Sequence, residues 1–251
     1  MNDNQPSRTG FDPVTKSGFF DRHRLFYKTG KIGTAPGRMN SRYEAIISRN
    51  LQHIKGKRIL DIASHDGRWS FAALKAGADS VVGVECDGEL VERAYKNFKH
   101  YGVHDGFVFL HNDIFGCNLQ NEKFDTIFCN GFLYHTTKHA ETFDLMARTD
   151  AQFIVLDTAV LNGRTNPNAV VYRKEAVYAD YPPSIARDGK TLVAIPSHGE
   201  ILFLAKHFGY SVEIYGWKDR LKHVPRKILR KATLGSQANG SRETFYLTRI
   251  S

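Results

Sequence analysis

The chain has 251 residues, with 35 Lys and Arg against 26 Asp and Glu, which gives a formal net charge of +9. Hydrophobic residues make up 41% and charged residues 24%, close to ordinary globular usage, which excludes a disordered, collagenous or coiled-coil chain. The length suits one large α/β domain with additions, or at most two small domains. No run of about 18 apolar residues occurs, and no apolar stretch follows the first charges, so we expect a cytoplasmic protein without a membrane span or secretory signal.

The positive charge is unevenly distributed along the chain. Residues 1–58 carry 12 basic and 4 acidic side chains (+8), residues 59–216 carry 14 and 20 (−6), and residues 217–251 carry 9 and 2 (+7). The excess therefore belongs to the two ends of the chain, where an acidic substrate or an RNA backbone would be met.

The three cysteines, Cys86, Cys117 and Cys129, are odd in number and lack the paired short spacing of a zinc site. We therefore expect reduced thiols rather than a disulfide framework, and no alternating cluster of His and carboxylates argues for a bound metal.

The first 55 residues are expected to form an arm and a helical cap. Residues 1–20 are polar, contain Gly and Pro and show no sustained period, which predicts a mobile arm. Ser41, with Glu44 three residues later, is a plausible helix N-cap, and the helix is expected to end at Gly56. The apolar residues on one face of this helix are Tyr43, Ile46, Ile47, Leu51 and Ile54.

After Gly56 the pattern changes to short apolar runs that alternate with helical patterns. Runs without polar alternation are typical of strands buried on both faces of a parallel sheet. The expected strands are residues 58–63, 80–85, 107–113, 124–130, 153–161, 211–217 and 243–250, and the expected helices include 68–78, 89–102, 140–147 and 197–207. The sequence therefore predicts an α/β protein with a Rossmann-like, doubly wound, seven-stranded, mostly parallel sheet.

Two stretches interrupt this rhythm. Residues 162–190, after the fifth strand, are too long for a tight connection and are interpreted as a lid insertion. Residues 218–231 resemble a basic amphipathic helix interrupted at Pro225.

Ligands of open parallel sheets bind outside the carboxyl ends of the strands, so the strand ends are the candidate site. Asp61 lies near the end of the first strand, and Ala63, Ser64 and Gly67 form a small-residue turn into the next helix. Glu85 ends the second strand, where a carboxylate can accept both hydroxyls of a ribose. The third strand ends at Asp113 and Ile114, which could border an adenine, and the fourth ends at Asn130.

The ordered set LDIASHDG, GVE, ND and FCNGFLYH resembles the class I S-adenosylmethionine-dependent methyltransferases over roughly residues 56–215. The resemblance implies that the loop from Ala63 to Gly67, including Ser64 and His65, faces the methionine part of the cofactor. It also implies that Glu85 binds the ribose, that Asp113 and Ile114 border the adenine and that Asn130 faces the transferable methyl group.

The sequence departs from the glycine-rich loop of that family at two positions, because Ala63 and His65 stand where glycines are usual. His65 could contact the cofactor carboxylate, orient a substrate or simply fill the space that the missing glycine leaves. A nicotinamide enzyme also uses a glycine turn and a ribose carboxylate, but the segment RWSF supplies no second glycine at the start of the helix.

A narrower resemblance concerns FLYH, the long insertion and IPSHGEILFLAKHFGYSVEI, which are similar to the tRNA wobble-uridine carboxymethyltransferases and their relatives. Those enzymes use a carboxylated form of the cofactor. The shared pattern is short and also occurs in small-molecule methyltransferases, so it favours an architecture more than a substrate.

Methyl transfer from a sulfonium needs alignment and management of the nucleophile's proton. His135 is our candidate for the general base, because it follows the fourth strand and imidazole titrates near neutral pH, although a structural role is an equal alternative. Tyr134 beside it is interpreted as a packing or substrate-facing residue. Asp66 is expected to cap the following helix. Arg68 could pair with an acidic side chain or with the cofactor carboxylate, but a solvated or structural role is favoured.

Aromatic and basic residues outside the sheet are the candidate substrate-facing set, which could hold an acidic or aromatic small molecule or clamp a nucleotide. The expected substrate-binding residues are Tyr27, Arg38, Tyr172, Arg173 and Tyr178.

The sequence therefore predicts an N-terminal arm and cap (residues 1–55) and a methyltransferase domain (56–251) that carries the lid and the basic segment. The expected function is S-adenosylmethionine-dependent methyl transfer to an O or N nucleophile of a small molecule. The alternatives are an RNA-modifying methyl- or carboxymethyltransferase and, from another class, a non-catalytic cofactor- or RNA-binding protein.

Overall fold

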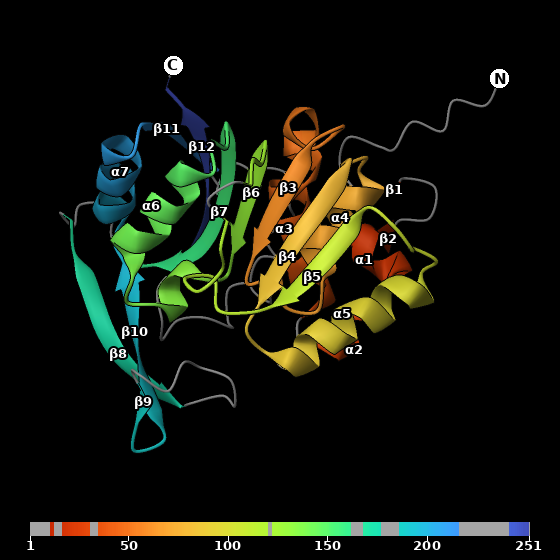
Figure 1. Cartoon of the computed structure of the whole chain (residues 1–251), viewed down its shortest axis with the longest axis horizontal. Helices are drawn as coiled ribbons and strands as arrows, with labels where there is room; N and C mark the ends of the chain where they lie inside the picture. The colour runs from red at the N-terminus through yellow and green to blue at the C-terminus, as the bar shows by residue number, and fades with distance from the viewer. Residues whose placement is uncertain are drawn as a thin grey trace, which may run out of the picture.

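A seven-stranded sheet forms the centre of the protein (Figure 1), as a computed structural model shows. The residues that the structure describes are 11–12, 17–30, 35–119, 122–161, 168–176, 186–215 and 241–250. The strands of the sheet are β3 (Arg58–Ile62), β4 (Ser80–Glu85), β5 (Phe107–His111), β6 (Thr126–Asn130), β7 (Phe153–Val160), β11 (Tyr210–Tyr215) and β12 (Ser241–Arg249).

The order of the strands is β11-β12-β7-β6-β3-β4-β5. The five strands from β7 to β5 are parallel, and β12 pairs antiparallel with both β7 and β11. The chain leaves β3 in one direction across the sheet and later crosses to β6 on its other side, so the strand order reverses between β3 and β6. The doubly wound, mostly parallel sheet predicted from the alternating pattern is confirmed, and the reversal places a ligand site at this point.

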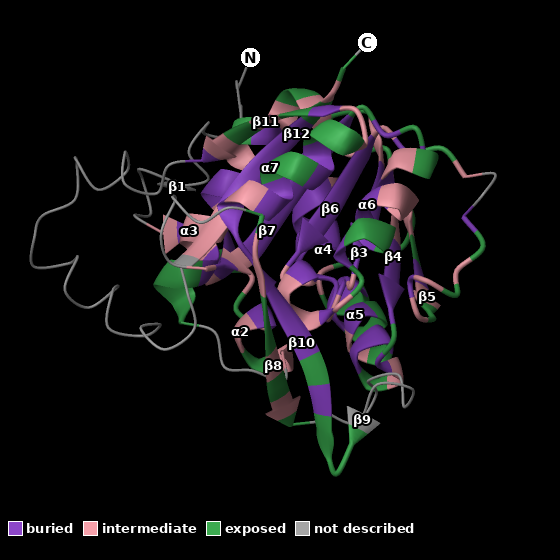
Figure 2. Ribbon diagram, turned by 90° about the vertical axis from the view of Figure 1, so that its left-hand side faces the viewer, coloured by how far each residue is buried: buried purple, intermediate pink, exposed green. Residues whose placement is uncertain are grey.

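Helices cover both faces of the sheet, as the two apolar clusters show. Ile59 of β3 belongs to the cluster with the N-terminal helices, whereas the next residue, Leu60, belongs to the cluster with the later helices. On the first face lie α1 (Phe19–Arg22), α2 (Phe26–Thr29), α3 (Pro36–Ile46), α4 (Arg68–Lys75) and α5 (Gly88–His100), and on the second lie α6 (His139–Arg148) and α7 (His198–His207). The central strands β3, β6 and β7 are buried between these layers (Figure 2), because alternate side chains enter opposite clusters.

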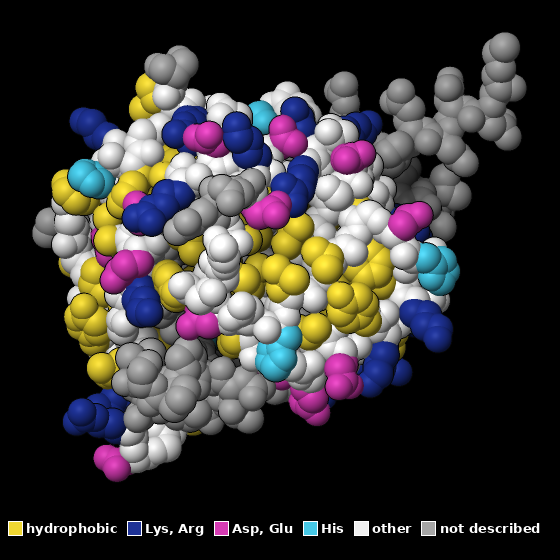
Figure 3. Space-filling model, viewed as in Figure 1, with side chains coloured by type: hydrophobic (Ala, Val, Ile, Leu, Met, Phe, Trp, Pro, Cys, Tyr) yellow, Lys and Arg dark blue, Asp and Glu magenta, His cyan; other side chains and the backbone are white. Residues whose placement is uncertain are grey.

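The chain segment between β5 and β6 contains no helix among its described residues, 112–119 and 122–125. Apolar side chains are therefore visible over β4 and β5 on the face shown in Figure 3, and Val108 of β5 is 40% exposed.

The N-terminal segment is more ordered than its polar composition predicts. A two-residue strand β2 (Ser17–Gly18) pairs with β1 (Phe11–Asp12), and α1 follows directly. Phe19 and Phe20 are buried in the cluster of the first sheet face. The prediction of a mobile arm up to residue 20 was therefore wrong for residues 17–20, because two aromatic side chains anchor them.

The helix expected from Ser41 begins five residues earlier. α3 starts at Pro36, where proline suits the first helical position because its missing N–H has no intrahelical partner. Ser41 therefore lies inside the helix and is not its N-cap. The predicted apolar face is confirmed, since Ile46, Ile47 and Ile54 are buried. The second part of the predicted helix is a 3-10 helix, η1 (Ser48–His53), which is kinked at Asn50.

The expected lid insertion, residues 162–190, overlaps a second, three-stranded antiparallel sheet that continues to residue 196, here called the inserted sheet. Its strands are β8 (Val170–Ala176), β9 (Ala186–Arg187) and β10 (Lys190–Pro196), in the order β8-β10-β9. Asp188 and Gly189 connect β9 to β10 with φ angles of 53° and 67°, the conformation of a two-residue hairpin turn. Figure 2 shows that β10 is buried where it joins the body and exposed at its outer end. The basic segment 218–231 lies outside the described residues.

Candidate functional site

The loop between β3 and α4 has left-handed backbone at three alternate positions. The φ angles are 53° at Ala63, 56° at His65 and 77° at Gly67. An alanine or histidine in this region costs about 1–2 kcal/mol relative to its right-handed conformation. The chain therefore keeps the backbone of a glycine-rich loop with two residues that strain it, which is typical of functional loops. At Gly67 a side chain is sterically excluded as well, because a Cβ would lie 2.9 Å from Phe98 and Phe109.

Glu85 holds this loop against the end of β4. Its carboxylate accepts hydrogen bonds from the backbone N–H groups of His65, at 2.8 Å, and Asp87, at 3.0 Å. The residue is buried. A carboxylate offers about four acceptor positions, so Glu85 can bind ligand hydroxyls while it keeps these bonds.

Three polar side chains at the strand ends are buried and have atoms without a protein hydrogen-bond partner. Asp61 Oδ2 accepts a hydrogen bond from the Ser70 hydroxyl at 2.6 Å, but its Oδ1 has no partner. The Ser64 hydroxyl and both amide atoms of Asn130 are also without a partner. An unpaired buried polar group costs about 1–3 kcal/mol, so this concentration at one sheet edge indicates a site built for a polar ligand.

Burial raises the pKa of Asp61 to about 7, against the hydrogen bonds from Ser70, which lower it. The negative charges of Glu85 and Asp66 raise it further. Asp61 is therefore poised to take up a cationic ligand group, because such a group would favour the ionised carboxylate.

Asp113 and Ile114 follow β5 at the same edge. Asp113 Oδ1 accepts the backbone N–H of Phe115 at 3.0 Å, and Ile114 is buried in the second cluster. The ammonium group of Lys138 lies 4.6 Å from the centre of the Phe115 ring and links this turn to the segment after η2 (Leu133–His135). The polar and apolar pair predicted to border an adenine is thus adjacent to the other strand ends.

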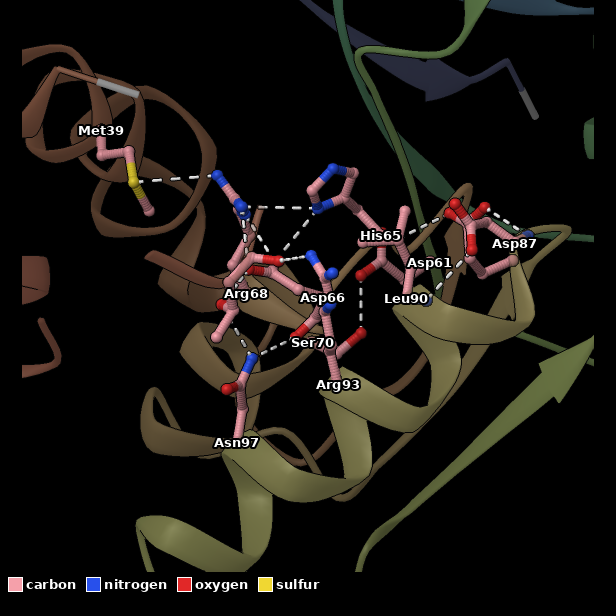
Figure 4. A network of polar contacts seen from close by, with 12 residues as sticks. Met39, Asp61, His65, Asp66, Arg68, Ser70, Asp87, Leu90, Arg93 and Asn97 are labelled. Atoms are coloured by element: carbon pink, nitrogen blue, oxygen red, sulfur yellow. Dashed lines mark hydrogen bonds and ion pairs between the residues drawn. The ribbon is translucent and has the colours of Figure 1, made fainter. Parts of the chain in front are cut away.

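A polar network joins the loop after β3 to the N-terminal helices (Figure 4). Asp66 is buried and accepts hydrogen bonds from Arg68 Nε at 2.6 Å and from the Thr29 hydroxyl at 2.5 Å. Asn97 of α5 donates to the Asp66 carbonyl and to Thr29. The N-terminal cap therefore reaches the candidate cofactor loop at the end of α2.

This network corrects the role expected for Asp66. The N-cap of α4 is Gly67, without a side-chain cap hydrogen bond, and Asp66 pairs with Arg68 instead. Burial alone would raise the pKa of Asp66, but the guanidinium of Arg68 overrides it and holds the pKa well below its usual range. Arg68 is buried and paired with an acidic side chain, which is the alternative considered for it and not a solvated role. The His65 ring lies beside it, with Nδ1 3.3 Å from Asp66.

A second network, which the sequence analysis missed, lies beside the end of β6 and is here called the Asp157 cluster. Asp157 of β7 is fully buried and lies 2.8 Å from Arg42 of α3 and 2.5 Å from Arg242 of β12. It also accepts the Thr244 hydroxyl at 2.9 Å, and Arg242 donates to the Tyr134 hydroxyl at 2.7 Å.

The Asp157 cluster carries two cations and one carboxylate. Burial would raise the pKa of Asp157, but the charges of Arg42 and Arg242 lower it. Burial lowers the pKa of Arg42 to about 10, against the attraction of Asp157. Both guanidinium groups lie near Gly131, which follows Asn130, since a Cβ at Gly131 would be 3.7 Å from Arg242 and 3.9 Å from Arg42. The part of the site edge beside Gly131 therefore has two guanidinium groups against one carboxylate. The sequence does carry one signal for this cluster, the carboxylate of Asp157 within the otherwise apolar strand FIVLDTAV. A buried carboxylate needs a cationic partner, which this position indicates.

His135, the candidate base, lies in η2 next to Tyr134, with ring centres 4.0 Å apart. Its Nδ1 is 3.5 Å from Oε2 of Glu175, which belongs to β8 of the inserted sheet. Tyr134 is held by Arg242 through its hydroxyl, so it joins the Asp157 cluster to η2.

The residues predicted to bind the substrate are dispersed. The Tyr27 hydroxyl donates to Asp21 at 2.7 Å within the N-terminal cap, and Arg38 is exposed in the first turn of α3. On β8, Tyr172 is 63% exposed and lies on the face of the inserted sheet opposite to Arg173. Tyr178 lies outside the described residues.

Among the described residues, no three His, Cys, Asp or Glu side chains are grouped so as to hold a metal ion. None of the helices within the described ranges is long and apolar enough to cross a membrane.

Residues 59–150, which include β3 to α6 and all four strand ends of the site, match the family model described as a methyltransferase domain. The chain is therefore similar to a methyltransferase domain over the part that carries these strand ends. The fold agrees over a longer stretch. The N-terminal domain of EvdMO1, crystallised with S-adenosylhomocysteine (SAH), superposes with a TM-score of 0.63 at 15% identity and covers 98% of this chain and 100% of that one. An S-adenosylmethionine-dependent methyltransferase from Mesorhizobium loti gives a TM-score of 0.57 at 14% identity, over 81% and 98% of the two chains. The fold is that of the class I methyltransferases, as the ordered motifs predicted.

The curated proteins that are similar in sequence share a more specific name than methyltransferase. The tRNA U34 carboxymethyltransferase of Pseudomonas fluorescens SBW25 is 36% identical over 120 residues, which are 44% of this chain and 35% of that protein. The enzyme of the same name from Pseudomonas putida GB-1 is 32% identical over 124 residues, or 45% and 36% of the two chains. The chain thus spans about a third of the length of these relatives. The local similarity to this group, noted from FLYH and the following segments, is confirmed.

Proposed function

We propose that the chain is an S-adenosylmethionine-dependent methyltransferase that acts on an O or N nucleophile of a small molecule. The observation that carries the proposal is the set of unpartnered buried atoms of Asp61, Ser64 and Asn130 beside Glu85, at the point where the strand order reverses. These groups match the polar parts of S-adenosylmethionine, which has an ammonium group, a carboxylate and two ribose hydroxyls.

Each residue of the edge has a role in this proposal. Asp61 binds the ammonium group, the loop from Ala63 to Gly67 supports the methionine part, and Glu85 accepts the ribose hydroxyls. Asp113 and Ile114 border the adenine, and Asn130 faces the reacting end. The cofactor supplies a methyl group on a positively charged sulfur. Because the sulfur becomes neutral in the reaction, the protein's main tasks are to align the nucleophile and to accept its proton.

We propose that His135 accepts the proton of the nucleophile. His135 lies in η2, which follows Asn130 in the chain. The Asp157 cluster beside Tyr134 has two guanidinium groups against one carboxylate, while Glu175 faces His135 on the same side. The two guanidinium groups would suit an acidic group on the substrate. We propose further that residues 1–55 form a cap on the domain of residues 56–251, since Thr29 is hydrogen-bonded to Asp66 of the cofactor loop.

A second candidate is carboxymethyl transfer to RNA. The curated relatives carry that name, and the unbalanced positive charge of Arg42 and Arg242 would suit a carboxylate on the transferred group. The +8 and +7 charges of the two chain ends would then serve the RNA backbone.

The test is a transfer assay with S-adenosylmethionine labelled in its methyl group, offered with bulk tRNA in one arm and with a small-molecule cell extract in the other. We expect label in the small-molecule arm, with transfer lost in His135→Ala while SAH affinity in calorimetry stays near normal. Label only in tRNA, or a carboxylated cofactor in the mass spectrum of the purified protein, would support the second candidate. SAH binding without transfer in either arm would indicate a non-catalytic binding protein.

A further inference from the structure

We infer that Glu175 of the inserted sheet is a positioning residue for His135, so that the insertion completes the general base. This inference rests on the proposed methyl transfer and extends it to a residue outside the methyltransferase domain match, which ends at residue 150.

The fold brings the two side chains together from segments 40 positions apart in the sequence. β10 pairs with β8 in a register that places Glu175 opposite Thr191, and β10 packs against η2, which carries His135. Successive residues of a strand face opposite sides, so Arg173 and Glu175 share one face of β8, while Tyr172 and Lys174 share the other. The Glu175 face is therefore the one turned toward η2.

The contact has the geometry of an orienting pair. His135 Nδ1 lies 3.5 Å from Glu175 Oε2, and the side chains are 27% and 33% exposed. Both groups are therefore accessible to a substrate and partly shielded from water. Hydrogen bonds at catalytic pairs are often long without substrate and shorten in the complex.

The charges around the pair favour an ionised Glu175. The neighbouring His135 lowers the pKa of Glu175, against burial, and the charge of Arg173 lowers it as well. On the elements packed against it, Thr191 of β10 is neutral, Tyr134 of η2 is bound to Arg242, and Asp157 of β7 is neutralised by Arg42 and Arg242. Glu175 is thus a carboxylate at neutral pH, where it holds the imidazole proton on Nδ1.

This tautomer leaves the lone pair of His135 on Nε2. During transfer the nucleophile forms a bond to the methyl carbon, the carbon–sulfur bond breaks and its electron pair remains on sulfur. The proton of the nucleophile passes to Nε2, and the resulting imidazolium is stabilised by the Glu175 carboxylate. The positive charge therefore moves from the sulfonium to a histidine that already faces a counter-ion, which is how a carboxylate assists a histidine base.

The inference is tested by NMR of the histidine rings, with His135 assigned through His135→Gln, in the wild type, Glu175→Gln and Glu175→Asp. In the wild type we expect the Nδ1–H tautomer. Glu175→Gln is expected to lower the population of the Nδ1–H tautomer, because the carboxylate that faces Nδ1 is lost. Glu175→Asp is expected to restore part of that population. Glu213→Gln, at an exposed position of β11, is the matched control and is expected to leave the tautomer unchanged.

SAH calorimetry on the same proteins distinguishes a failure of the inference about Glu175 from a failure of the proposed function. The inference holds if Glu175→Gln changes the tautomer of His135 while SAH affinity stays within about twofold. An unchanged tautomer in Glu175→Gln, with SAH still bound, would overturn it. Failure of the wild type to bind SAH would instead overturn the proposed function.

Discussion

The buried carboxylate of Asp61 makes cofactor affinity dependent on pH. Its pKa is raised to about 7 in the free protein, mainly by burial, so the group binds a proton below neutral pH. The amino group of SAH is cationic over this range and pairs with the ionised form alone. Binding at acid pH must therefore expel a proton from Asp61.

The size of the effect follows from the ionised fraction of Asp61. With a pKa of about 7, the carboxylate is about one-eleventh ionised at pH 6 and ten-elevenths ionised at pH 8. The affinity for SAH is therefore expected to rise about tenfold between these values, which corresponds to about 1.4 kcal/mol. The folding stability depends on pH in the opposite direction. The pKa of Asp61 is raised above 3.8, so the folded protein retains a proton that the unfolded chain loses. The contribution of Asp61 to stability is thus lost as the pH rises from about 4 to about 7.

The assay is calorimetry with SAH at pH 6, 7 and 8, on the wild type and on Asp61→Asn, which keeps the size of the side chain. The variant is expected to bind more weakly at pH 8 and to lose the tenfold dependence, while other titrating groups contribute equally to both proteins. An SAH affinity that does not change from pH 6 to pH 8 in the wild type would refute the assignment of Asp61 to the amino group.

Three further substitutions test the loop, the ribose contact and the Asp157 cluster. Glu85→Ala is expected to weaken SAH binding by about 1–3 kcal/mol, because two ribose hydroxyls lose their acceptor; unchanged affinity in calorimetry would remove Glu85 from the ribose site. Ala63→Gly is expected to raise the free energy of unfolding in urea by about 1 kcal/mol, since glycine relieves the left-handed strain, and a loss of stability would contradict the strain argument. Asp157→Asn is expected to destabilise the protein by about 3 kcal/mol, because two partly buried guanidinium groups lose their counter-ion. The control Asp144→Asn removes an exposed pair with an arginine one helical turn away and is expected to cost less than about 0.5 kcal/mol; equal losses in the two variants would contradict the reasoning.

The sequence predicts the central sheet well because its signals are local. The parallel strands are mainly apolar runs, and β3 and β4 are each followed by a helical pattern within a few residues. The inserted sheet was not predicted as strands, since β8 and β10 carry exposed apolar residues such as Tyr172 and Leu192 and show no clean alternation of burial. Asp188–Gly189 was the overlooked signal, because this dipeptide is typical of a two-residue hairpin turn.

The strand-end residues of the site follow from the same local logic, whereas the Asp157 cluster does not. Arg42 and Arg242 reach Asp157 from 115 and 85 positions away, and no pattern in one sequence reports such contacts. Glu175 was missed for the same reason, because only the pairing of β8 with β10 brings it to His135. The order of the N-terminal aromatic residues also depends on long-range contacts, since Phe19 and Phe20 are buried by helices that come later in the chain.

The most direct test of the account is a crystal structure of the protein with SAH. We expect SAH to lie over residues 63–67, with its amino group at Asp61 Oδ1, its ribose hydroxyls on the Glu85 carboxylate and its adenine beside Ile114. SAH bound elsewhere, or bound with Asp61 and Asn130 still unpartnered, would contradict the central claim that these strand ends form the cofactor site.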